Sequence, residues 1–251
     1  KCNVGSSATA NDSYRFKTFA SDVLTFTGVT SGNSASATVV SAQAGRQTIA
    51  AAGTVAVSLD SSSPSYAIGA GGATGQTIGV AKFRPSNEAV NLAKVGLTLT
   101  NGSYSGPSGA QDLVNVYIYN GSTLVGTATF TGNATTATST LIGSGVNLPK
   151  DVDTRLTVKV DLADVGTSQP GTQGDLVKVD ILNFEGSGAQ SGTTVQGGTT
   201  GGMTTAVSGI RLLNTYPTVA QGALSSGSGS ASAGKLIRFS VAANSAGDVG
   251  I

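Results

Sequence analysis

The sequence predicts an all-β protein made of tandem Ig-like antiparallel β-sandwich modules. Three observations carry this prediction. Helical periodicity is scarce, short apolar runs alternate with turn residues at a spacing of roughly ten residues, and the chain repeats itself. Segment 22–67 recurs at 175–220 with a constant shift of 153, so that Val57 matches Ile210 and Leu59 matches Leu212. Self-similarity at a fixed period is typical of arrays of modules.

Alternation of apolar and polar residues predicts the first strands. Run 54–59 alternates and ends before Pro64. Run 77–83 also alternates, but its three core candidates share one face only if the strand slips through a bulge. These candidates are Ile78, Val80 and Phe83. Run 93–100 then has one apolar face, formed by Val95, Leu97 and Leu99.

A hairpin is predicted in the middle of the module. Run 113–119 is followed by Asn120-Gly121, a strong two-residue turn signal because both residues tolerate φ > 0. Run 122–131 is the returning strand. Its apolar face is formed by Leu124, Gly126, Ala128 and Phe130.

The later strands complete the predicted sandwich. They are 138–142, 155–162, 176–182 and 207–213, and the second of them directs Leu156, Val158 and Val160 inward. The regions 186–205 and 221–234 are rich in Gly, Ser and Thr and are predicted to be long loops or edge ribbons. With one Cys and no Trp, the chain lacks the antibody-type Cys…Trp…Cys signature, so "Ig-like" refers to architecture only.

The repeat predicts the domain boundaries. Residues 57–209 form one complete module, 1–56 the C-terminal part of a preceding module, and 210–251 the N-terminal part of a following one. The match continues beyond the constant shift, because Lys82-Phe83-Arg84 corresponds to Arg238-Phe239-Ser240.

Composition argues against several classes of function. Charged residues make up 11% of the chain and the net charge is +1, so no clustered Lys and Arg are expected to neutralise nucleic-acid phosphates. No run approaches the roughly 18 apolar residues of a membrane-spanning helix. We therefore expect neither a nucleic-acid partner nor a membrane-spanning segment.

The sequence predicts no enzyme activity. The absence of His removes the usual general base and the His-containing triads and zinc motifs. A carboxylate pair could still hydrolyse glycosides. The nearest pairs are Asp151 with Asp153 and Asp161 with Asp164, and both are better explained as solvated turn or strand-end residues.

No cofactor is expected, with calcium as the open alternative. Five Asp residues lie at predicted strand ends, where carboxylate and carbonyl oxygens could bind Ca²⁺, although no Asp-x-Asp-x-Asp-Gly loop is present. These weak candidates are Asp151, Asp153, Asp161, Asp164 and Asp175. Ordinary turn capping by Asp is the alternative explanation.

Four N-glycosylation sequons are present, and all but the first lie in predicted turns. The acceptor candidates are Asn11, Asn101, Asn120 and Asn133. Thr- and Ser-rich runs such as 135–140 are candidates for O-linked glycans instead.

Three segments resemble recurrent elements of large, repetitive surface proteins of uncultivated bacteria. They are the hairpin 112–128, the Leu148-Pro149-Lys150-Asp151 turn before strand 156–161, and the segment 238–244. The resemblance covers most of 57–251. It implies tandem β-sandwiches of the surface-layer or extracellular filament type, and it carries no catalytic residue.

Together these features favour a structural subunit of a self-assembling extracellular filament or surface layer at the cell surface. Lateral or head-to-tail contacts between sandwiches would join copies of the chain. The alternative is an adhesin stalk or a glycan-binding module that contacts cell-surface glycans. That alternative needs exposed aromatic side chains, for which Tyr104, Tyr117 and Tyr119 are the candidates.

Overall fold

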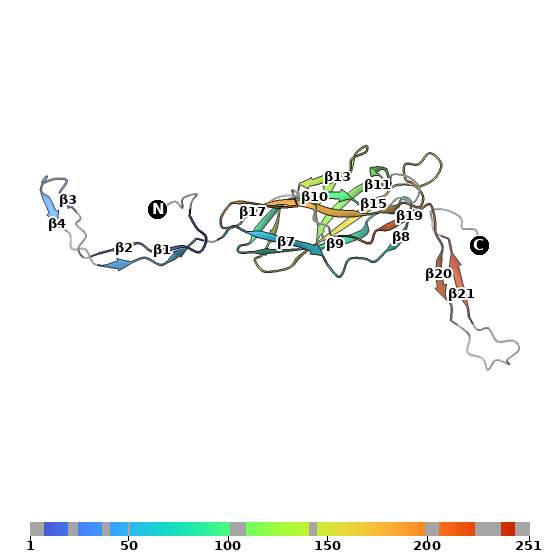
Figure 1. Ribbon diagram of the computed structural model, residues 1–251, viewed down its shortest axis with the longest axis horizontal. Coiled ribbons are helices and arrows are strands. Elements are labelled where there is room, and N and C mark those ends of the chain that lie inside the picture. Colours follow the sequence, from blue (N-terminus) through green and yellow to red (C-terminus); the bar gives the residue numbers. More distant parts are fainter. Residues whose placement is uncertain are drawn as a thin grey trace. The chain divides into compact units, whose positions relative to one another are not determined.

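A computed structural model describes residues 8–19, 25–36, 41–49, 51–100, 109–140, 145–198, 206–223 and 237–243. Strands dominate this part of the chain, which contains one short 3-10 turn, η1 (Ala110–Asp112), and no α-helix (Figure 1). The predicted all-β class is therefore confirmed. No helix in these segments has the length and apolar character needed to span a membrane. The chain divides into two compact units, Lys1–Ala51 and Ala52–Ile251.

The first unit contains short antiparallel strand pairs. The pairs are β1 (Ser13–Tyr14) with β6 (Gln47–Thr48), β2 (Lys17–Thr18) with β5 (Ala42–Gln43), and β3 (Thr25–Thr27) with β4 (Ser34–Ser36). The register is nearly the same in all three pairs: Ser13 lies opposite Thr48, Lys17 opposite Gln43, and Thr25 opposite Ser36. The three pairs thus keep nearly one register around a turn at 28–33. We call them the N-terminal ribbon.

Three sheets make up the sandwich of the second unit. The first has the order β12 (Thr123–Ala128), β11 (Leu113–Asn120), β15 (Thr154–Leu162), β9 (Gln76–Ser86), β7 (Thr54–Leu59). The second has the order β13 (Thr136–Thr140), β10 (Val90–Leu99), β17 (Val179–Gly188), β18 (Thr194–Gly197), and β14 (Val146–Leu148) also pairs with β10. The third has the order β16 (Leu176–Val177), β19 (Ile210–Leu213), β8 (Ala67–Ala70), in which β19 and β8 are parallel.

One apolar core joins these sheets. Phe83 of β9 and Phe184 of β17 meet edge to face with ring centroids 6.1 Å apart, so side chains of the first and second sheets pack together. The predicted inward residues of β15 are buried, as are Val95 and Leu97 of β10. This packing is that of a β-sandwich, and its Ig-like topology stays a prediction.

Two details of register explain how the apolar patterns reach the core. A shift in the pairing of β9 with β15 leaves Ile78 as an extra residue, and this bulge allows Ile78 and Phe83 to enter the core together. Val80 follows the bulge and pairs with Thr157, so it is buried on the opposite face and the three predicted core residues do not share one face. A second shift leaves Val125 as an extra residue on β12. Leu124 is consequently more exposed than predicted, whereas Ala128 and Phe130 are buried.

The predicted strands differ from the structure in several places. Strands β8, β14 and β18 are additional, and the predicted strand 176–182 is interrupted at Lys178. In the hairpin Asn120 already pairs with Thr123, so the two turn residues are Gly121-Ser122, one position later than predicted. The predicted module boundaries after residues 56 and 209 stay predictions.

A further antiparallel pair follows β19. It consists of β20 (Thr218–Gln221) and β21 (Phe239–Ala242), which we call the C-terminal ribbon. Its described side chains are largely exposed.

Candidate functional site

Buried carboxylates are the main polar feature inside the second unit. They are Asp60, Glu88, Asp112, Asp175 and Asp180. A buried charge costs several kcal/mol unless hydrogen bonds or an opposite charge replace its water. Asp60, Glu88, Asp112 and Asp180 accept hydrogen bonds from backbone N–H groups, so they fix the loops at the ends of the strands.

Glu88 lies in the turn between β9 and β10 and binds two other segments. Its Oε1 accepts hydrogen bonds from the Gly53 amide at 2.9 Å and the Ser191 hydroxyl at 2.6 Å. Its Oε2 accepts from the amides of Gln190 and Ser191, both at 2.9 Å. Asn87 Nδ2 also donates to the Ala52 carbonyl at 3.1 Å. We call this arrangement the Glu88 socket, because it holds residues 52–53 at the start of the second unit.

The four donors keep Glu88 ionised despite its burial. Burial raises the pKa of its carboxyl, but the hydrogen bonds from Ser191, Gln190 and Gly53 outweigh that effect and leave the pKa below its ordinary value. No Lys or Arg is recorded as a partner in the described part of the chain. The socket is therefore built from neutral donors that suit an anion.

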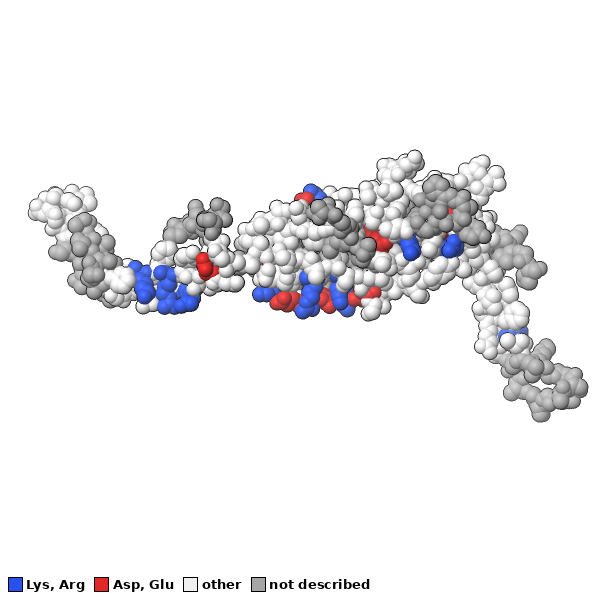
Figure 2. Space-filling model, in the orientation of Figure 1, with Lys and Arg blue, Asp and Glu red and all other residues white. Residues whose placement is uncertain are grey.

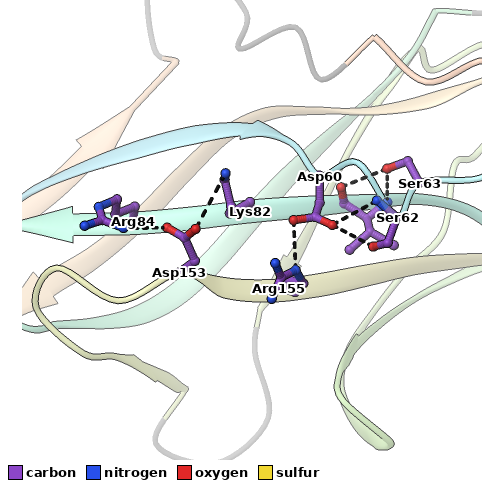
Figure 3. A network of polar contacts seen from close by, with 8 residues as sticks. Asp60, Ser62, Ser63, Lys82, Arg84, Asp153 and Arg155 are labelled. Carbon is purple, nitrogen blue, oxygen red and sulfur yellow. Dashed lines mark hydrogen bonds and ion pairs between the residues drawn. The ribbon is translucent and has the colours of Figure 1, made fainter.

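A row of ion pairs crosses β7, β9 and β15 (Figure 3). Asp60 follows β7 and accepts from Arg155 Nε of β15 at 2.8 Å. Asp153, just before β15, lies 3.6 Å from Lys82 Nζ and 3.1 Å from Arg84 Nη1, both on β9. The charges in this row largely cancel. Figure 2 shows such a mixed row on one side of the second unit, beside a surface that is mostly uncharged.

Asp60 also fixes its own turn. Its Oδ1 accepts from the Ser62 amide at 3.0 Å and the Ser62 hydroxyl at 2.7 Å. The hydrogen bonds from Ser62 and then the interaction with Arg155 lower the pKa of Asp60 from 3.8 to about 2. This carboxylate therefore stabilises the fold above pH 3.8, and the contribution is lost as the pH falls towards 2.

We expect Asp60→Asn to lower the melting temperature by a few degrees at neutral pH. The gap between variant and wild type should narrow between about pH 4 and pH 2, because only the wild type loses a charge there. Circular dichroism melts across this range measure the gap. Asp151→Asn is the matched control, since Asp151 is exposed in a turn with φ of 60° that Asn also adopts. A gap that stays constant down to pH 2 would contradict the role of Asp60.

Asp180 ties the segment before β19 to the sandwich. It lies on β17 and accepts from the Val207 amide at 2.9 Å, and its other oxygen accepts from the Thr100 hydroxyl. Val207 precedes β19, so Asp180 holds the chain just before this strand. Glu88 and Asp180 thus anchor the backbone before β7 and before β19, respectively.

The five predicted calcium ligands do not gather at one place. Asp151 is an exposed turn residue, Asp153 belongs to the ion-pair row, and Asp164 is exposed. Asp161 accepts from the Gly75 amide at 2.8 Å and from the Tyr117 hydroxyl at 2.7 Å. Asp175 is fully buried. Within the described segments, no three acidic or Cys side chains come together in a way that could hold a metal ion.

The predicted catalytic pairs and glycosylation sites have ordinary surroundings. One member of each carboxylate pair has partners within the fold. Asp153 forms ion pairs with Lys82 and Arg84, and Asp161 accepts hydrogen bonds from Gly75 and Tyr117. Asn11, Asn120 and Asn133 are exposed at or beside turns, where a glycan could project. Asn101 lies outside the described residues. Glycosylation stays a prediction.

The tyrosines considered for glycan binding are partly engaged. Tyr117 and Tyr119 alternate with the buried Val116 and Ile118, so both lie on the outer face of β11. The Tyr117 hydroxyl bonds to Asp161, and Lys159 Nζ lies 5.0 Å from the centre of the Tyr119 ring. Tyr104 lies outside the described residues.

Sequence reasoning missed most of the buried carboxylates. Asp175 alone was among the candidates, and it was proposed for calcium rather than for burial. Glu88 has one sequence signal, since Asn87-Glu88 interrupts two alternating runs, but a turn acid normally lies in solvent. Its donors at 53 and 190–191 are distant in the chain, so only the fold reveals them.

No family model, no curated protein and no solved structure matches this chain.

Proposed function

We propose that the chain is a structural subunit of a self-assembling extracellular filament or surface layer, joined to its copies through β-strand contacts. The observation that carries the proposal is the exposure of apolar side chains on two-stranded ribbons. The extracellular, cell-surface location rests on the resemblance to repetitive bacterial surface proteins.

The N-terminal ribbon has core-type side chains without a core around them. Tyr14, Phe16 and Phe26 are 53%, 62% and 50% exposed. An isolated two-stranded ribbon is marginally stable in water, and its free edges can pair with another strand. A neighbouring copy that covers these rings would stabilise the ribbon and join the two chains.

The C-terminal ribbon shows the same property more clearly. Phe239 corresponds in the repeat to Phe83, which is fully buried, yet Phe239 is 61% exposed. Val219 on the paired strand and Ile237 are also exposed. The repeat therefore presents a core residue at the surface, where a neighbouring strand or sheet can bury it.

Low charge favours close packing of copies. The chain has 14 basic and 13 acidic residues, and several of the charges are cancelled in the ion-pair row or buried. Long-range repulsion between copies is consequently small. The mostly uncharged surface in Figure 2 agrees with this argument.

The proposal predicts that two substitutions on the N-terminal ribbon weaken assembly. Wild-type protein should form regular fibres or lattices in electron micrographs and sediment as large particles. Phe16→Ser combined with Phe26→Ser should raise the concentration needed for assembly at least tenfold, since two buried rings are lost from each contact.

A matched variant tests whether the ribbon itself matters. Val114→Ser combined with Val152→Ser removes two equally exposed apolar side chains from the second unit. It should leave assembly unchanged. Equal weakening by both variants would overturn the role of the ribbon. Dispersed wild-type monomers that bind a glycan array would overturn the assembly proposal in favour of the glycan-binding alternative.

A further inference from the structure

Two fully buried carboxyl groups lie between η1 and a long loop of the second unit. Asp112 is the last residue of η1, and Asp175 ends the loop 163–175, which connects β15 to β16. Both residues are 0% exposed. Asp112 Oδ1 accepts from the Thr172 amide at 2.9 Å, whereas its Oδ2 is buried with no hydrogen-bond partner within the described segments.

Backbone hydrogen bonds fix the two residues in place. The Ala163 amide donates to the Asp112 carbonyl at 2.9 Å, at the start of the loop. The Leu212 amide of β19 donates to the Asp175 carbonyl at 2.8 Å. The backbone of Asp112 is therefore tied to the start of the loop, and the backbone of Asp175 to β19.

We propose that Asp112 and Asp175 share one proton in a buried carboxyl–carboxylate hydrogen bond, which latches the loop 163–175 to η1. The proton gives Asp112 Oδ2 the partner that it otherwise lacks. It also leaves the pair with one negative charge instead of two, and two adjacent buried charges would repel each other strongly.

The surroundings suit a shared proton better than a metal ion. Ca²⁺ requires about six to eight oxygen ligands. Asp112 instead receives backbone hydrogen bonds at Thr172 and Gly109, which stabilise an anion and supply no ligand. A further donor, Gln111 Nε2 of η1, bonds to Thr172 Oγ1 at 3.3 Å in this part of the loop.

The electrostatics of the pair agree with this geometry. Burial raises the pKa of Asp112, and the charge of Asp175 and the hydrogen bond to it raise that pKa further, against the backbone donors. In such a coupled pair the titration belongs to both carboxyl groups together.

Other charged groups on the neighbouring elements include Arg211, Asp161, Asp164 and Lys178. Arg211 of β19 donates to the Gly174 carbonyl and to the Tyr66 hydroxyl. Asp161 bonds to Gly75 and Tyr117, and Asp164 is exposed. The Lys178 side chain packs beside Gly209. The segment 101–108, which precedes η1, contains no acidic or basic residue.

The latch has a definite pH dependence. Because the folded-state pKa of Asp112 is raised, the contribution of the pair is complete at low pH and is lost as the pH rises through that pKa. One proton then passes to solvent and two repelling carboxylates remain. This dependence is opposite in sign to that of Asp60 and Glu88.

Carboxyl-carbon NMR of the isotope-labelled full chain tests the shared proton. Across pH 3 to 10, we expect one proton on the Asp112–Asp175 pair to persist well above about pH 4, where an ordinary Asp carboxyl titrates. Titration of both carboxyl groups near pH 4 would overturn the proposal. If added CaCl₂ stabilises the wild type against heat at neutral pH but has no such effect on Asp112→Asn, the pair binds a cation and the shared-proton proposal is wrong.

Two variants test the latch. In Asp112→Asn the side-chain amide donates permanently to Asp175, so exchange protection of the loop amides should become independent of pH, after correction for intrinsic exchange. Wild-type protection should fall at alkaline pH. In Asp112→Ala the protection factors of the loop amides should be at least tenfold lower than in Asp112→Asn at every pH. Equal loss in Asn and Ala variants, or a wild-type loop indifferent to pH, would refute the latch.

Discussion

Glu88→Ala is expected to destabilise the second unit by about 4 kcal/mol. Four donors lose their acceptor, of which the Gly53 amide is buried and the other three are partly buried, and each unsatisfied donor costs about 1 kcal/mol. For a domain of this size the melting temperature should fall by roughly 10 °C or more. Urea unfolding followed by circular dichroism measures the loss.

Two further variants separate the socket from a general effect of charge. Glu88→Gln keeps one acceptor oxygen but turns its amide towards two N–H donors, so about half of the loss should remain. Glu185→Gln is the matched control, because Glu185 pairs with Lys94 at 3.0 Å in a half-exposed position. Such a surface pair is worth less than about 1 kcal/mol. Equal losses at positions 88 and 185 would contradict the socket.

The Glu88 socket also bears on the proposed structural role. Residues 52–53 are where the chain enters the second unit, and the socket ties them to the turns at 87–88 and 190–191. A pulling force on the entering chain would thus be carried by several strands rather than by β7 alone. A filament subunit that carries tension needs such an attachment.

Local patterns predicted much of the fold because strand burial is a property of neighbouring residues. Alternation placed Leu156, Val158 and Val160 inside β15, and the mismatch at Phe83 correctly required a bulge in β9. Leu124 was predicted to lie inside and is instead the least buried of its group, since the extra residue Val125 has no signature in the sequence.

The buried carboxylates could not be predicted in this way. The donors to Glu88 lie 35 and 102–103 residues away. Asp112 and Asp175 are similarly distant in sequence and meet only because η1 and the loop 163–175 are neighbours. An isolated Asp or Glu in a turn normally indicates a solvated residue, so no local pattern predicts burial at Glu88 or Asp112.

The two copies of the repeated strand occupy different places. Val57 of β7 pairs with Phe83 in the first sheet, whereas its counterpart Ile210 of β19 pairs with Ala67 and Val177 in the third. Matching sequences therefore end up at the beginning and at the end of one sandwich. Pairing depends on which strands are available, and that is the physical reason why Phe239 can differ from Phe83.

Substitution of these two equivalent phenylalanines should give opposite results. Phe83→Ala empties a core position against Phe184 and should destabilise the second unit by about 3–5 kcal/mol. Phe239→Ala removes an exposed ring and should change the stability of the dispersed chain by no more than about 0.5 kcal/mol. Assembly, followed by sedimentation and electron microscopy, should instead weaken in Phe239→Ala, because a core-type ring is lost from the contact between copies. A large loss of stability in Phe239→Ala would show that the ring is already buried within the chain. Unchanged assembly of Phe239→Ala would show that the C-terminal ribbon takes no part in the contact between copies. The stability measurement therefore tests the exposure of Phe239, and the assembly measurement tests its role in the contact.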